Sequence, residues 1–197
     1  MKIDLTEIYK GLAEWRAERG ITAESQKEGY LVNIMEEFGE LSQALRDYEK
    51  FSKHDCPYCK IDKQKAEHEI IDALCDICVF TINAWDDLSC EVKPFIIMPR
   101  YGVNAADIFV AIADFIRTDN NRTPFRFYDF VGILHNCASV CEQYGFNFEI
   151  AMLETIKEIS SRTGSYDEVS KKWIKDESWE AQTKWYKADY EKARIEQ

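Results

Sequence analysis

The chain has 197 residues, 46% of them hydrophobic, which is enough for one globular domain with a sizeable core. Its formal net charge of -11 disfavours binding to nucleic acid or to an anionic membrane surface. Four Pro and eight Gly are too few for a many-turned β architecture, so we expect an all-α helical bundle.

The first residues give no sign of a secretory leader. The N-terminus turns polar at Lys2 and Asp4, and no run of about 18 apolar residues exists to span a membrane. Seven cysteines are present, and four lie inside apolar helical patterns, where a reduced cysteine acts as a small core residue: Cys75, Cys78, Cys137 and Cys141. We therefore expect a cytoplasmic protein with no membrane partner.

Apolar periodicity predicts helices over 3–19, 28–52, 66–88, 104–118 and 126–144, and a sixth from the N-cap Asn147 through Ser161. Residues 53–65 are predicted to be a polar connection, and Gly164 stands just past the sixth helix. Residues 164–177 are predicted to be irregular, and a last helix follows from Ser178. We expect a helical domain over 1–163 and an extension over 164–197 that packs on the same domain or on a partner subunit.

Two acidic motifs stand on the two long predicted helices. Glu36, Glu37 and Glu40 lie on the first, and Glu69 and Asp72 on the second. Carboxylates three residues apart share one face of one helical turn, so two facing turns would gather several oxygen ligands. Such a concentration of negative charge away from water favours a hard cation, with Mg²⁺ first and Mn²⁺ possible.

The second helix carries a longer polar seam. At about 100° per residue, four of its side chains fall within roughly 60° of one another: Glu69, Asp72, Asp76 and Asn83. This seam is either the wet face of an amphipathic helix or the wall of a crevice. Val79 and Phe80 flank it, and no Lys or Arg occurs between Lys65 and Lys93 to balance it, which favours the crevice.

On the first long helix, Glu37 and Glu40 form the better ligand pair, and Glu36 lies nearest solvent. Gly39 costs about 1 kcal/mol relative to Ala at mid-helix. It is either a tolerated glycine or a point of close approach by a helix or a ligand. A ferritin-like di-iron site is disfavoured, because none of the three histidines stands in a Glu-x-x-His turn: His54, His68 and His135.

The two motifs, with 28 residues between Glu40 and Glu69, resemble the signature of the all-α nucleoside triphosphate pyrophosphohydrolases. These are the MazG-like proteins and the dimeric dUTPases and dCTPases. The resemblance covers residues 28–88, and more weakly 150–176. It implies Mg²⁺-dependent cleavage of a nucleoside triphosphate between its α and β phosphates, in a homodimer or homotetramer.

The resemblance also implies site residues. Glu37, Glu40, Glu69 and Asp72 would bind metal, Asp76 would bind a second ion or orient water, and Glu36 or Glu40 would accept the proton of the attacking water. A second register places the family's aspartate at Asp76, where Asn83 then matches an Asn of some MazG-like proteins. In that register Ala73 replaces the preceding acid, so the first register is preferred.

Several further residues are candidates for substrate binding. Lys157, Arg162 and Lys175 would hold phosphates, although Lys157 and Arg162 equally suit the C-terminal end of a helix dipole. In many members of the family an Asn stands in the later segment, and the equivalent place here is Ile159. Asn83 would hydrogen-bond a sugar or a base.

Aromatic residues and one cysteine motif each allow two interpretations. Trp15 and Tyr30 would stack on a base, or they belong to the core. Three further tryptophans are expected to bury against the bundle or a partner subunit: Trp173, Trp179 and Trp185. The loop sequence Cys56-Pro57-Tyr58-Cys59 is either a pair of free thiols or, with His54 and His68 nearby, part of a zinc site.

Three functions are compatible with these features. The first is the pyrophosphohydrolase. The second is a regulatory module that binds a nucleotide without turning it over, and the third is a structural bundle with no metal. The four acids that would bind metal favour catalysis: Glu37, Glu40, Glu69 and Asp72.

Overall fold

The computed structural model describes residues 2–22, 29–86, 96–121, 126–167, 169 and 172–196. It is mostly helical with only small sheets, which confirms the expected all-α class. None of the described helices is both long and apolar enough to cross a bilayer.

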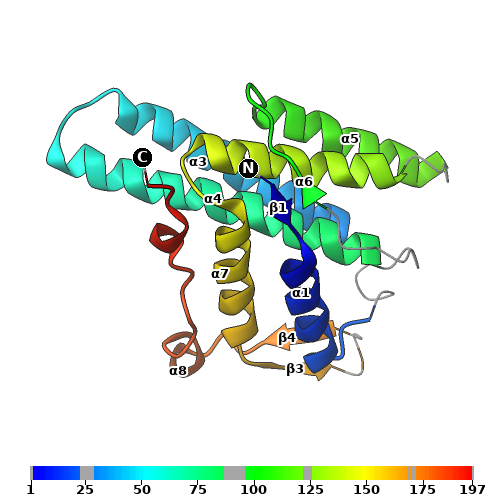
Figure 1. Ribbon diagram of the computed structural model, residues 1–197. Helices are drawn as coiled ribbons and strands as arrows, with labels where there is room; N and C mark the ends of the chain where they lie inside the picture. The colour runs from blue at the N-terminus through cyan, green and yellow to red at the C-terminus, as the bar shows by residue number, and fades with distance from the viewer. Residues whose placement is uncertain are drawn as a thin grey trace.

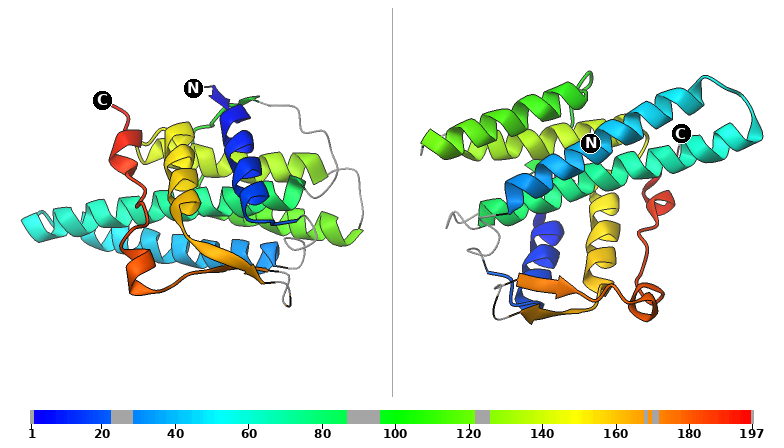
Figure 2. Two further views of the ribbon diagram at one scale, coloured as in Figure 1. Left: turned by 90° about the horizontal axis from the view of Figure 1, so that it is seen from below. Right: turned by 180° about the vertical axis from the view of Figure 1, so that it is seen from behind.

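Two antiparallel helix pairs form the upper part of the molecule in Figure 1. The first pair is α3 (Tyr30–Ser52) with α4 (Pro57–Asp86), and the second is α5 (Ala105–Asn121) with α6 (Arg126–Gln143). The α3 stripe buries Ile34, Leu41 and Ala44 at the spacing of a helix face. The tip where α3 turns into α4 projects beyond the rest of the molecule in Figures 1 and 2.

Helix α4 begins earlier than expected. It starts at Pro57, whereas the sequence predicted a polar connection over 53–65. Pro at the first helical position is favourable, and residues 57–65 continue a helix whose later turns are buried. The first turns of α4 carry no apolar stripe because they lie in solvent: the side chains of Tyr58 and Ile61 are 80% and 65% exposed.

Helices α1 (Thr6–Glu18) and α7 (Phe148–Ser161) lie side by side and cross beneath the long helices. The predicted cap of α7 is confirmed, because the Asn147 side chain accepts a hydrogen bond from the Ile150 N–H at 3.0 Å. The two helices approach closely at Gly11, where an added Cβ would lie 3.1 Å from Ile156.

The core confirms the expected role of the helical cysteines. Cys75, Cys78, Cys137 and Cys141 are buried and free among Ile, Leu and Phe side chains. Burial raises the pKa of the Cys75, Cys78 and Cys141 thiols well above the ordinary value. These cysteines are therefore packing groups.

Two short sheets were not expected. Strand β1 (Ile3–Asp4) pairs antiparallel with β2 (Ile96–Ile97), so α1 begins at Thr6 and not at residue 3. Strand β3 (Gly164–Asp167) pairs antiparallel with β4 (Lys172–Lys175), within the segment predicted to be irregular. The β3–β4 hairpin lies beneath α1 and α7 in Figure 1.

The C-terminal segment returns to the bundle. The predicted last helix is a single turn, α8 (Trp179–Gln182), and the chain continues to the 3-10 helix η1 (Tyr190–Ala193). The Ile195 N–H donates to the Gly145 carbonyl at 2.8 Å, and the Asn147 N–H donates to the Ala193 carbonyl at 2.6 Å. The segment therefore packs against the start of α7 in its own chain. Residues 23–28 and 87–95, on which the ends of two predicted helices fall, lie outside the described residues.

Candidate functional site

Three helices bring acidic side chains to one region. Helix α3 carries Glu36, Glu37 and Glu40, α4 carries Asp72 and Asp76, and α7 carries Glu158. Spacings of three and four residues place each set on one helix face. The carboxylates are close enough to perturb one another's protonation, and Arg162, just after α7, acts on Glu37, Asp72 and Asp76.

The effect of these neighbouring charges on protonation is clearest at Glu37. Burial, together with the charges of Glu40, Asp72 and Glu36, raises its pKa from the ordinary value to about 7, against the opposing effect of Arg162. A carboxyl with a pKa near neutrality can exchange a proton at physiological pH. This property is common in catalytic acids and bases, and in metal ligands before the metal binds.

The two aspartates of α4 are perturbed in the same direction. Burial raises the pKa of Asp76 well above the ordinary value, and Asp72 and Glu37 raise it further. Burial also raises the pKa of Asp72, against the hydrogen bond from Tyr190. The nearby cation that lowers the pKa of both aspartates is Arg162, and its effect is smaller than that of burial. Negative charge is therefore in excess at this site.

The C-terminal segment fixes two of these acids. The Tyr190 hydroxyl donates to Asp72 Oδ1 at 2.5 Å and lies 3.0 Å from the Thr155 hydroxyl. Burial raises the pKa of Tyr190, so its hydroxyl stays protonated and acts as a donor. Glu158 accepts from the Ala188 N–H at 2.7 Å and from Arg162 Nη2 at 2.9 Å.

A cavity of about 490 Å³ opens beside the acids. Its walls are of three kinds: acidic (Glu36, Glu37, Asp76), cationic (Arg162, Lys175), and apolar or aromatic (Trp15, Ile21, Val79, Phe80, Ile159, Trp173), completed by Gly29 and Asn33. This volume lies within the range of small-molecule sites. An anionic ligand with an aromatic part would meet matching chemistry on the cationic and aromatic walls.

Arg19 holds the aromatic wall in place. Its guanidinium lies 5.4 Å from the Trp15 ring and 5.0 Å from the Trp173 ring. It also donates to the carbonyls of Ile159, Ser160 and Arg162 at the C-terminal end of α7, at 3.3, 2.8 and 3.1 Å. One buried cation therefore ties α1, α7 and the β3–β4 hairpin together around the cavity.

The structure brings together only part of the predicted ligand set. Glu37, Asp72 and Asp76 share the acidic region, and Glu40 is exposed beside them. Glu69 lies apart from this region: it is exposed and pairs with Lys65 at 3.5 Å on its own helix. It is not among the largest influences on the pKa of Asp72 or of Asp76. Asp76, and not Glu69, therefore belongs to the acidic region.

Only some of the predicted substrate-binding residues line the cavity. Trp15, Arg162 and Lys175 line the cavity. Lys157 is exposed and stacks at 3.8 Å on the Tyr186 ring, away from the residues that line the cavity. Asn83 is 1% exposed and accepts from Arg16 Nη1 at 2.5 Å. Its Nδ2 is buried and finds no hydrogen-bond partner within the described part of the chain.

The aromatic expectations have mixed outcomes. Tyr30 is buried and packs edge-on against Phe115 at 6.0 Å, so its core role is confirmed. Trp173 lines the cavity, Trp185 is partly buried, and Trp179 is 78% exposed in this chain. An added Cβ at Gly39 would meet no atom within 4 Å, so among the described residues of one chain nothing approaches this glycine closely.

Glu158, Tyr190 and Arg19 were missed from the sequence. Glu158 stands four residues before Arg162, a spacing that predicts a helical ion pair but not which cavity the pair faces. Tyr190 is 118 residues from Asp72, and Arg19 is at least 140 residues from its three carbonyl partners on α7 and just after it. Short sequence patterns cannot predict contacts between residues so far apart in the chain.

In the described ranges, no three His, Cys, Asp or Glu side chains are arranged around one point as a ready-made metal site would require. The donor chemistry nevertheless fits a hard cation, because buried carboxylates outnumber the cationic groups that face them. Comparisons with protein-family models, with curated proteins and with solved structures found no match.

Proposed function

We propose that the chain is a nucleoside triphosphate pyrophosphohydrolase that depends on Mg²⁺ or Mn²⁺ and releases a nucleoside monophosphate and pyrophosphate. The observation that supports this proposal most strongly is the cavity itself. Carboxylates from α3 and α4, the cations Arg162 and Lys175, and the rings of Trp15 and Trp173 all line this one cavity.

The ligand set that we propose is Glu37, Glu40, Asp72 and Asp76, and the charge of Glu158 acts on both aspartates. Closing this set around an ion requires the longer glutamate side chains to turn toward the aspartates, since the set is not preassembled among the residues that the structure describes. When bound, the cation would neutralise phosphate charge and lower the pKa of a bound water.

The residues of the chain would then have separate tasks. Arg162 and Lys175 would hold the phosphates by charge-assisted hydrogen bonds. Trp15, Trp173 and Phe80 would enclose the base, where stacking contributes about 1–3 kcal/mol per base. Glu36, which lines the cavity and lies outside the proposed ligand set, could accept the proton of the attacking water.

The decisive experiment incubates the protein with Mg²⁺ or Mn²⁺ and a panel of ribo- and deoxynucleoside triphosphates, and measures both products. We expect equal amounts of monophosphate and pyrophosphate from at least one substrate. Release of inorganic phosphate with a diphosphate would contradict the proposed position of cleavage.

A matched pair of variants separates the two registers. Asp76→Asn should lower kcat/KM by about a hundredfold or more, because it removes a carboxylate of the proposed metal set. Glu69→Gln should retain activity within about threefold, because Glu69 lies apart from the other acids. The reverse result would restore Glu69 to the site and reject the ligand set proposed above.

The unassembled ligand set of the described residues also favours a second candidate, a module that binds nucleotides without hydrolysing them. Metal-dependent nucleotide binding, measured by calorimetry without either product forming, would support that candidate over the hydrolase.

A further inference from the structure

The cysteine pair at the tip of the α3–α4 hairpin stands apart from the cavity and from the core. Cys56 and Cys59 are joined by a disulfide with a Cα–Cα distance of 5.2 Å, so the pair is neither two free thiols nor a zinc site in this structure. The tip projects from the body of the molecule, and Tyr58 between the cysteines is 80% exposed. Reagents in solution can therefore reach the pair.

The two sulfurs lie in different environments at the start of α4. Cys56 directly precedes α4, which has 30 residues, and Cys59 lies in its first turn. The Cys59 N–H donates to Cys56 Sγ at 3.1 Å, as a capping side chain would accept it. After reduction, this N–H and the N-terminal end of the helix dipole would stabilise a thiolate on Cys56.

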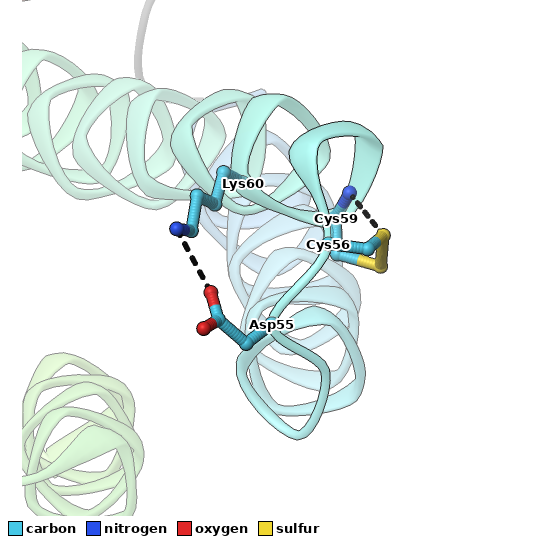
Figure 3. The surroundings of a disulfide bond; sticks show 4 residues. All are labelled: Asp55, Cys56, Cys59 and Lys60. Atoms are coloured by element: carbon cyan, nitrogen blue, oxygen red, sulfur yellow. Dashed lines mark hydrogen bonds and ion pairs between the residues drawn. A yellow bond between two sulfur atoms is a disulfide. The ribbon is translucent and has the colours of Figure 1, made fainter.

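Neighbouring charges do not oppose this thiolate. Lys60 pairs with Asp55 at 2.8 Å, and Figure 3 shows that pair on the other side of the turn from the two sulfurs. Lys53 pairs with Glu49 at 2.9 Å on α3. The nearby charges of Asp55 and Glu49 are thus each paired with a lysine, and the start of α4 is the feature that favours a thiolate on Cys56.

We propose that Cys56 and Cys59 form a thiol–disulfide exchange site for low-molecular-weight disulfides and thiols. Cys56 is the attacking sulfur and Cys59 the resolving sulfur. This chemistry is independent of the proposed hydrolase activity, and the buried cysteines of the core cannot take part in it.

The exchange balances with glutathione disulfide as the oxidant. The Cys56 thiolate attacks one glutathione sulfur, the S–S bond breaks, and one glutathione leaves as a thiolate that takes up a proton. Cys59 loses its proton to solvent and attacks the Cys56 sulfur, and the second glutathione leaves and is protonated. The pair loses two electrons, which glutathione disulfide gains.

The test uses the full chain in buffers with a series of ratios of reduced to oxidised glutathione. Acid quenching, alkylation and peptide mass spectrometry then report the state of each cysteine. We expect Cys56 and Cys59 to convert together between dithiol and disulfide, while Cys137 and Cys141 stay reduced as internal controls. A pair that remains a dithiol in excess glutathione disulfide would overturn the proposal.

Single variants assign the two roles. Cys59→Ser should accumulate one glutathione on Cys56, whereas Cys56→Ser should acquire glutathione on Cys59 about tenfold more slowly. Equal rates in the two variants would reject the assignment of the attacking sulfur. Stoichiometric zinc in the reduced, purified protein would reject the exchange site altogether, because both thiolates would then serve as metal ligands.

Discussion

The protonation of Glu37 connects the stability of the fold to the proposed function. Its pKa is about 7 in the folded protein, above the ordinary value of 4.5, so the folded state binds its proton more tightly than the unfolded state. Stability from this group is therefore complete below about pH 4.5 and is lost as the pH rises through 7. A bound cation would favour the ionised form and reverse this loss.

We predict that Glu37→Gln flattens the fall in melting temperature between about pH 5 and pH 8 in metal-free buffer. At about pH 8 the variant should melt a few degrees above the parent protein, because no carboxylate must be ionised in that environment. Thermal melts across the pH range measure this. Glu14→Gln, at an exposed position of α1, is the control and should leave the slope unchanged. An unaltered slope in Glu37→Gln would contradict the prediction.

Tyr190 acts on the cavity through Asp72. We predict that Tyr190→Phe lowers stability by about 1–3 kcal/mol, because a buried hydrogen bond to a carboxylate is lost. It should also weaken Mn²⁺ binding by about three- to tenfold, since Asp72 would hold its proton more tightly. Denaturant unfolding and calorimetric titration measure the two effects.

Tyr186→Phe is the matched control for this prediction. Tyr186 also donates its hydroxyl to a carboxylate, that of Glu154, but the pair does not line the cavity. The control should lose stability without any change in Mn²⁺ affinity. Equal losses of affinity in both variants would show that the effect is general destabilisation.

At the scale of elements, the β3–β4 hairpin leaves no room for a side chain at Gly164. A Cβ at Gly164 would lie 2.2 Å from the Ile174 carbonyl oxygen and 2.5 Å from the Trp173 ring. We predict that Gly164→Ala displaces β4, costs about 1–3 kcal/mol and raises KM, because Trp173 forms part of the cavity wall. Gly39→Ala, with open space at its Cβ, should instead gain up to about 1 kcal/mol. Measured KM and unfolding curves for both variants test this contrast.

The long helices could be predicted because the pattern that indicates each helix lies within or beside its own residues. The stripe that buries Ile34 and Leu41 has the helical period, and the Asn147 cap is a side chain beside the helix that it starts. The β3–β4 hairpin could not, because residues 164–175 carry neither apolar alternation nor a recognised turn pair. Its position depends on Arg19, far away in sequence, stacking on Trp173.

In the candidate site, too, local patterns could be predicted and contacts between distant residues could not. Spacing indicated the acids of α3 and α4, and the register preferred from the sequence chose Glu69 and Asp72. The acidic region of the structure instead holds Asp76 beside Asp72, while Glu69 pairs with Lys65. The choice depends on where α7 and Arg162 cross α4. Glu158 and Tyr190 belong to the acidic region only through that crossing.

For the whole molecule, the net charge of -11 and the acidic region together predict stabilisation by divalent cations. Mg²⁺ or Mn²⁺ at about a hundred times its dissociation constant should add about 2.7 kcal/mol to the free energy of unfolding. The rise in melting temperature should be larger at about pH 8 than at about pH 6, because the ligands must be ionised. KCl at equal ionic strength and the Asp76→Asn variant are the controls, and a rise of the same size in either would indicate screening.

The homodimer or homotetramer expected from the family resemblance stays a prediction. Large apolar side chains exposed on α3 and α5 would be covered in such an assembly: Val32, Met35, Phe109 and Val110. Light scattering on the eluting peak of a sizing column should give a mass of about two or four chains of 23.1 kDa. A single-chain mass across the micromolar range would count against assembly.

The bond between Tyr190 and Asp72 spans 118 residues, and its two partners are translated in a fixed order. Asp72 leaves the ribosome long before Tyr190 has been made. During that interval the nascent chain carries the acids of α3 and α4 without their hydroxyl donor. A chain that stops before Tyr190 therefore leaves Asp72 without this hydrogen bond.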